Sequence, residues 1–102
     1  MDADIQAIYE RLRNRYPLAL SSSLSLGFKS KMDFPVLHGQ SSLGRFELFY
    51  DDVPSFAFYA MGDNRTVFAH FHLQTPSKAE ETVIDFMEGK LTMIQFGQQN
   101  NT

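Results

Sequence analysis

Two histidines set two residues apart are the part of this sequence best suited to chemistry. His70 and His72 alternate with apolar residues across 66–74, a pattern typical of a β-strand. Because successive strand residues point to opposite faces of a sheet, both imidazoles project from the same face. Two imidazoles at this spacing can bind one metal ion, and a third protein ligand would complete a catalytic zinc site. The candidates for that ligand are His38, Glu47, Asp51, Asp52 and Asp63.

The same pair has a second interpretation, in which both imidazoles pack as ordinary side chains. Phe68 and Phe71 lie beside them in the chain, and histidine is often partly buried in proteins. No HExxH motif or carboxylate-rich pattern accompanies the pair. We therefore predict no metal ion and no cofactor. A metal-dependent hydrolase or small-molecule binder that uses His70 and His72 is the alternative.

The remaining reactive side chains give no support for an enzyme. Asp51 and Asp52 are adjacent, so they would point apart in a strand, and acids before Val-Pro are typical of turns. The serines at 21–23 lack the GxSxG or SxxK pattern that activates a serine nucleophile. No glycine-rich phosphate loop is present. We therefore assign no catalytic residue and favour a protein that is not an enzyme.

Composition excludes several classes of protein. The absence of cysteine rules out a disulfide scaffold and a thiolate metal site, and it favours a reducing, cytoplasmic setting. The apolar runs are far shorter than the ~20 residues that span a bilayer, and the N-terminus does not have the pattern of a signal peptide. The formal charge is only -3 and the lysines and arginines are scattered, which disfavours nucleic-acid binding.

The elements that must position these side chains predict an α+β fold. Residues 4–16 place Ile5, Ile8 and Leu12 at helical spacing, and Pro17 ends this helix. Alternating or β-rich segments predict strands at 24–28, 34–38, 45–50, 55–61 and 66–74, with a turn at 39–42. The connections 51–54 and 62–65 are short and rich in turn-forming residues. They predict an antiparallel β-meander of four to five strands.

A second helix is predicted after the last strand. Either Thr75 caps it with Pro76 at the first helical position, or Ser77 and Glu80 form a capping box. Its predicted apolar face consists of Ala79, Val83, Ile84 and Met87, with Leu91 as a further member if the helix continues. Gly89 is the predicted C-terminal stop, residues 91–96 form a last strand or more helix, and 97–102 are a frayed tail. Residues 1–102 are thus expected to form a single domain, with both helices packed on one face of the sheet.

Alternation then assigns the strand side chains to two faces. The predicted core face carries Phe46, Leu48, Tyr50, Val67, Ala69, Phe71 and Leu73. The opposite face carries Phe49, Phe68, His70 and His72, together with Tyr59 or the set of Phe56 and Phe58. Two helices can cover only one face, so this leaves more apolar surface than a monomer usually exposes.

The predicted function is therefore a non-enzymatic protein-binding module. The face that carries Phe49, Phe68, His70 and His72 would bind a protein partner or a second copy of the chain, since aromatic residues are enriched in interfaces. Imidazoles inside such an interface would make association depend on pH near neutrality. The alternative is that the sheet curls around a second small core, or that residues 18–28 or the C-terminal tail cover this face.

Two blocks within residues 34–90 carry a resemblance to a known type of protein. They are PVLHGQSSLGRFELFYDD and HFHLQTPSKAEETVIDFMEGK, and between them they span the meander and the second helix. In this pattern the chain resembles small uncharacterised bacterial α+β proteins of the toxin-immunity type. The resemblance implies a cytoplasmic inhibitor that blocks a partner by occlusion. It implies no site residues, because immunity proteins bind through surfaces that differ between members.

Overall fold

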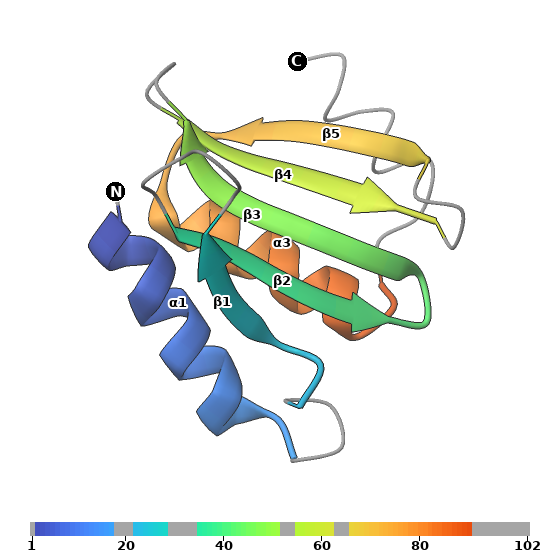
Figure 1. Ribbon diagram of the computed structural model, residues 1–102, viewed down its shortest axis with the longest axis horizontal. Coiled ribbons are helices and arrows are strands. Elements are labelled where there is room, and N and C mark those ends of the chain that lie inside the picture. Colours follow the sequence, from blue (N-terminus) through green and yellow to red (C-terminus); the bar gives the residue numbers. More distant parts are fainter. Residues whose placement is uncertain (1, 18–21, 29–34, 52–54, 63–65, 91–102) are drawn as a thin grey trace.

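The computed structural model contains one five-stranded antiparallel sheet and two helices (Figure 1). It describes residues 2–17, 22–28, 35–51, 55–62 and 66–90, except for the side chains of Asp2, Phe28, Asp51 and Phe68. The element order is α1 (Asp2–Arg15), β1 (Ser25–Phe28), β2 (Pro35–Ser41), β3 (Gly44–Asp51), β4 (Ser55–Met61), β5 (Val67–Leu73) and α3 (Pro76–Met87). Neighbouring strands pair in chain order, so the predicted meander and the α+β fold are confirmed.

Several predicted segments lie wholly or partly outside the described residues. They are the start of the second strand at Phe34, the turns at 51–54 and 62–65, the strand or helix at 91–96, and the tail at 97–102. Of the helices in the described part of the chain, none has the length and apolar character needed to cross a membrane.

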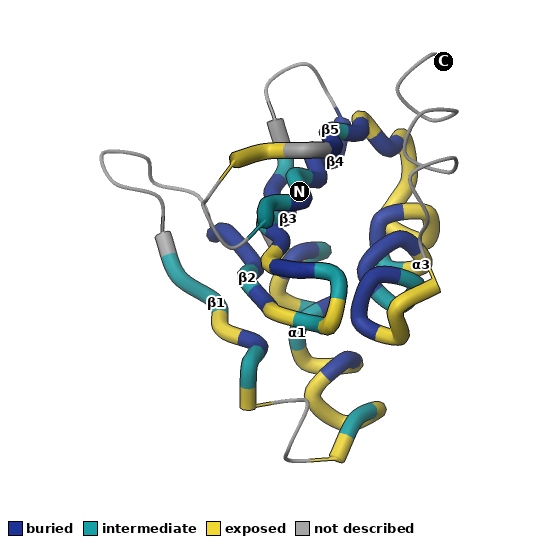
Figure 2. The backbone as a smooth tube through the Cα atoms, turned by 90° about the vertical axis from the view of Figure 1, so that its right-hand side faces the viewer, coloured by how far each residue is buried: buried dark blue, intermediate teal, exposed yellow. Residues whose placement is uncertain are grey.

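Both helices pack on one face of the sheet, as predicted. Ile5, Ile8 and Leu12 form the buried stripe of α1, which contacts β1, β2 and β3. Helix α3 contacts β2, β4 and β5, and the two helices also contact each other. Figure 2 shows them side by side on the same side of the strands. A single large core therefore lies between the helices and the sheet.

Helix α3 begins and ends at local signals. The Oγ1 of Thr75 accepts a hydrogen bond from the Lys78 backbone N–H at 3.1 Å, and Pro76 is the first helical residue. This is the first of the two predicted caps. Gly89, just past the helix, has a φ of +70°, which favours glycine. The predicted apolar face missed Phe86, a fully buried residue that follows Val83 by one helical turn.

Four phenylalanines from four elements form the centre of the core. Phe58 of β4 stacks on Phe46 of β3 and on Phe71 of β5, with ring centroids 5.7 and 5.8 Å apart. Phe86 of α3 meets the Phe58 ring at 69° and 5.7 Å, which is the edge-to-face geometry that aromatic pairs favour. The rings thereby connect β3, β4 and β5 to the second helix.

Val67 is not a core residue, and that prediction was wrong. Its side chain is 47% exposed, although Ala69, Phe71 and Leu73 further along β5 are buried as predicted. Ala60 pairs with Ala69 but Met61 pairs with Val67, which leaves Phe68 as one extra residue in β5. Such a bulge shifts the alternation of faces by one position, so Val67 falls out of phase.

Ion pairs between the two helices are concentrated at Glu80 and Glu88. Arg11 donates from its Nε to Glu80 at 2.8 Å, and Arg15 pairs with Glu88 at 3.3 Å. Glu88 also pairs with Lys90 at 2.9 Å and accepts a hydrogen bond from Tyr16. The Lys90 ammonium, and then Arg15, hold the pKa of the Glu88 carboxyl below its usual value.

Glu88→Gln is expected to destabilise the fold at neutral pH and to do so less in acid. A carboxyl whose pKa is lowered by folding stabilises the folded state above its unfolded pKa of about 4.3, and this contribution is lost as the pH falls through the folded pKa. The measurement is urea unfolding of both proteins at pH 7 and pH 3. Glu10→Gln, an exposed position on α1, is the control. A stability difference for Glu88→Gln that is the same at both pH values would contradict the prediction.

Candidate functional site

The sheet face opposite the helices gathers all three histidines of the chain, and we refer to it as the histidine face. Its residues are Ser25, Gly27, Val36, His38, Gln40, Arg45, Glu47, Phe49, Ala57, Tyr59, Met61, His70 and His72. His38 pairs with Glu47, Glu47 with Tyr59, and Tyr59 with His70. These side chains form one row across four strands, because cross-strand partners project from the same face.

The two histidines of β5 share this face, as their spacing predicts. The His70 ring stacks on Tyr59 with a centroid distance of 4.2 Å and an angle of 11°, and it lies 4.6 Å from the His72 ring. The Nδ1 of His72 is 3.0 Å from the hydroxyl of Ser55, which is buried. His72 is exposed, whereas the Nε2 atom of His70 is buried. Stacking and hydrogen bonding thus hold both imidazoles in place.

The alternative metal site stays a prediction. No group of three histidines, aspartates or glutamates within metal-binding reach occurs among the described residues. Of the predicted third ligands, His38 and Glu47 are separated from His70 by Tyr59 in the row. The Nδ1 of His38 is 3.8 Å from the Oε2 of Glu47. The Asp51 side chain, Asp52 and Asp63 lie outside the described residues.

Phe49 lies on the predicted face but is not exposed there. Its side chain is 6% exposed and packs with Val36 and Ala57 in a second hydrophobic cluster, against which Tyr59 also packs. The Phe49 and Tyr59 rings stack with centroids 5.7 Å apart. This agrees with the alternative of a second small core and removes Phe49 as an exposed anchor. The side chain of Phe68 lies outside the described part of the chain.

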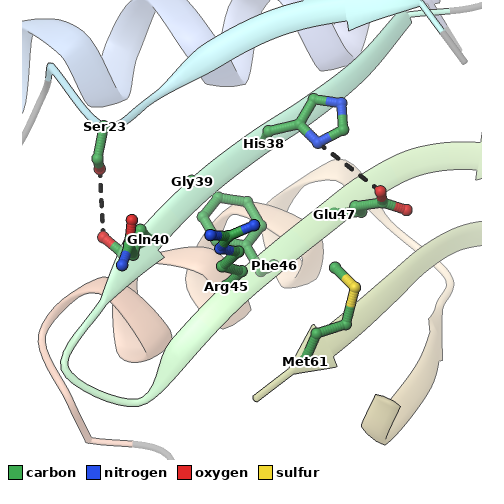
Figure 3. A pocket seen from close by; sticks show the side chains of 8 residues that line it. All are labelled: Ser23, His38, Gly39, Gln40, Arg45, Phe46, Glu47 and Met61. Atoms are coloured by element: carbon green, nitrogen blue, oxygen red, sulfur yellow. Dashed lines mark hydrogen bonds and ion pairs between the residues drawn. The ribbon is translucent and has the colours of Figure 1, made fainter. Parts of the chain in front are cut away.

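A pocket of about 330 Å³ opens at the β2–β3 end of the histidine face (Figure 3). It is lined by Ser23, His38, Gly39, Gln40, Arg45, Phe46, Glu47 and Met61. The Ser23 hydroxyl donates to the backbone carbonyl of Gln40 at 3.2 Å, which ties the segment before β1 to β2 at the rim. The lining combines a guanidinium, a carboxylate, an imidazole and an amide with the thioether of Met61.

Arg45 stands out electrostatically in this pocket. It is exposed, and among the described residues it has neither a carboxylate at ion-pair distance nor a side-chain hydrogen bond. On the helices, Arg11, Arg15 and Lys78 pair with carboxylates, and Arg13 donates a hydrogen bond to the Tyr9 hydroxyl. A guanidinium carries five donors, and those of Arg45 are available to a ligand.

No family model, curated protein or solved structure matches this chain. Its function therefore has to be inferred from the chemistry and geometry of the histidine face. The resemblance to immunity proteins stays a prediction.

A second hollow, of about 420 Å³, lies where β5 meets α3. Its lining includes His72, Lys78, Glu81 and Asp85. Lys78 and Glu81 already pair with each other at 3.9 Å, and partial burial raises the pKa of Asp85. Since Lys78 already has a carboxylate partner, this hollow is less suited to binding an anionic ligand than the pocket at Arg45.

Sequence reasoning missed Gln40 and Arg45 as candidate site residues. The predicted turn at 39–42 was wrong, because β2 continues to Ser41 and Gly44 pairs with Ser41 across a two-residue loop. That register places Gln40 opposite Arg45 and His38 opposite Glu47. The sequence signal that could have indicated the hairpin at 42–43 was the glycine at position 44, because glycine readily adopts the positive φ of +132° found there.

Proposed function

We propose that this protein is a non-enzymatic, cytoplasmic protein-binding module that uses the histidine face. The observation that carries the proposal is the collection of His38, His70, His72, Tyr59 and Arg45 on the one sheet face that neither α1 nor α3 covers. Tyrosine and arginine are the residue types most often responsible for binding energy in interfaces. The ring stack of Tyr59 on His70 and the contact of His72 with Ser55 hold these three side chains in place, which limits the entropy lost on binding.

The exposed polar and amphipathic residues, rather than Phe49, are the anchors in this proposal. Phe49 supports Tyr59 from below through the ring stack described above. His72 and Arg45 are exposed, and Tyr59 is partly exposed. The interface we propose is therefore polar at its edges, with Tyr59 and the stacked His70 imidazole at its centre.

The partner we propose is a different protein rather than a second copy. Among the described residues, the ionisable side chains that define this face are those of one arginine, one glutamate and three histidines, and Glu47 is already beside His38. Two identical faces of that composition would bring the same donors together and supply few acceptors, which disfavours a symmetric contact. A toxin is the partner class implied by the resemblance to immunity proteins, and we propose it as the first to test.

Site-specific photo-crosslinking tests this function. Tyr59 is replaced by p-benzoylphenylalanine in the cells that make the protein, with the same replacement at Gln6, exposed on α1, as the control. We expect Tyr59 to yield one adduct with another protein, identified by mass spectrometry, and Gln6 to yield none. An adduct at twice the mass of the chain would assign the face to self-association instead.

The identified partner then allows a direct binding measurement. His72→Glu should weaken binding by roughly tenfold or more, because it changes an exposed residue of the interface. Gln6→Glu adds the same charge to α1 and should leave binding unchanged. Gln40→Glu serves as a second face variant if circular dichroism shows that His72→Glu unfolds the chain. Binding that survives in every folded face variant would overturn the proposal.

A further inference from the structure

We infer that the Arg45 pocket binds a carboxylate side chain, that of an aspartate or glutamate, presented by a protein partner. This inference rests on the proposed function for the source of the carboxylate, while the pocket itself is a feature of the chain. It adds to the proposed function the chemistry by which the partner is recognised.

The Arg45 guanidinium is available to bind a ligand in this pocket. Arg45 has no carboxylate partner among the described residues, and Figure 3 shows it in the middle of the residues that line the pocket. A guanidinium binds a carboxylate through two parallel hydrogen bonds, which fixes orientation as well as adding energy. A partner's acid would therefore find a donor pair that the fold leaves unused.

The residues around Arg45 suit a side-chain carboxylate. Gln40, its exposed cross-strand partner on β2, brings an amide that can donate a further hydrogen bond. Met61 pairs with Arg45 from the other side, on β4, and lines the same pocket. Its thioether is an apolar, adaptable surface on which the methylene groups of a glutamate can pack. Donors on one side and an apolar wall on the other match an acid on a short aliphatic stem.

A nearby carboxylate argues against a phosphate ligand. Glu47 follows Arg45 by two residues on β3, so it projects from the same face and lines the same pocket. Its Oε2 is 3.8 Å from the Nδ1 of His38. The negative charge of Glu47 repels any anion in the pocket, and it repels the two charges of a phosphate dianion about twice as strongly as the single charge of a carboxylate. Of these two anions, the pocket therefore favours the carboxylate.

The test is a titration of the ¹⁵N-labelled protein followed by amide chemical shifts. The probe is glutamate blocked as its N-acetyl, N-methylamide derivative, and the matched control is the same derivative of glutamine. We expect saturable shifts at residues 38–40 and 45–47 with the glutamate probe only. Arg45→Gln should weaken this binding by roughly tenfold or more. Arg13→Gln, which changes an exposed arginine on α1, should leave it unchanged.

Each outcome separates this inference from the proposed function. Absent shifts, or shifts that survive Arg45→Gln, would overturn the carboxylate site. Tighter binding of inorganic phosphate at the same ionic strength would also overturn it. If the crosslinked partner binds Arg45→Gln as well as it binds the wild type, the inference fails and the proposed function stands. If the probe binds at Arg45 but Tyr59 yields no crosslink, the carboxylate site stands and the proposed function fails.

Discussion

Phe58→Ala is expected to lower the free energy of unfolding by about 3–5 kcal/mol. Phe58 is fully buried, and its ring contacts those of Phe46, Phe71 and Phe86. Truncation removes the ring from an apolar environment and leaves a cavity that three other rings must close around. Stability of most small domains is only about 5–15 kcal/mol, so this loss is a large part of the total.

Chemical denaturation followed by circular dichroism measures this effect, since the chain has no tryptophan to serve as a fluorescent probe. Phe58→Leu is the matched variant, because it keeps most of the apolar volume and should cost clearly less. Equal losses for alanine and leucine would show that the ring stack, rather than the filled volume, provides the stability. A loss below about 1 kcal/mol for alanine would contradict the packing described for this core.

Gly39→Ala is expected to destabilise the fold by about 1–3 kcal/mol. Gly39 lies inside β2 opposite Phe46, and the Phe46 ring lies against the glycine Cα. A Cβ at this position would collide with Cε1 of that ring and would meet Cδ2 of Leu24 at 2.9 Å. Both neighbours are buried in the main core, so neither can move without disturbing other contacts.

Gly27→Ala is the matched control for this prediction. Gly27 is also a strand glycine, in β1, but a Cβ there would meet no atom within 4 Å. We expect this substitution to be neutral or slightly stabilising, because alanine reduces the conformational entropy of the unfolded chain. Thermal unfolding of the two variants and the wild type provides the comparison. Equal effects of the two substitutions would show that the Phe46 ring does not constrain position 39.

Stability and proposed binding reside on opposite faces of one sheet. Phe58 and Gly39 belong to the helix-covered face, whereas Arg45 and His72 are exposed on the histidine face. Substitutions at exposed positions away from special features usually change stability by less than about 0.5 kcal/mol. Binding variants such as Arg45→Gln should therefore retain the fold, so that a loss of binding can be interpreted directly.

The helices, most of the strands and the shared face of His70 and His72 could be predicted from sequence. Each depends on a periodicity that is contained within one segment: about 3.6 residues in a helix and two in a strand. The stripe of Ile5, Ile8 and Leu12 is an example, since its spacing alone indicates a buried helix face. The start of α3 could also be predicted from a local signal, because Thr75 and Pro76 act on backbone groups within one helical turn.

The remaining features depend on contacts between segments, which no single segment encodes. The register of β2 against β3 brings His38 and Arg45 to the histidine face, and a bulge at Phe68 turns Val67 outward. Glycine is typical of turns, but Gly39 lies within a strand, where the Phe46 ring occupies the space that a larger side chain would need. Phe49 alternates like an exposed anchor but is buried by packing in the second cluster. Register and packing are set by side chains distant in the chain, and so they emerged only when the strands were paired and the core was filled.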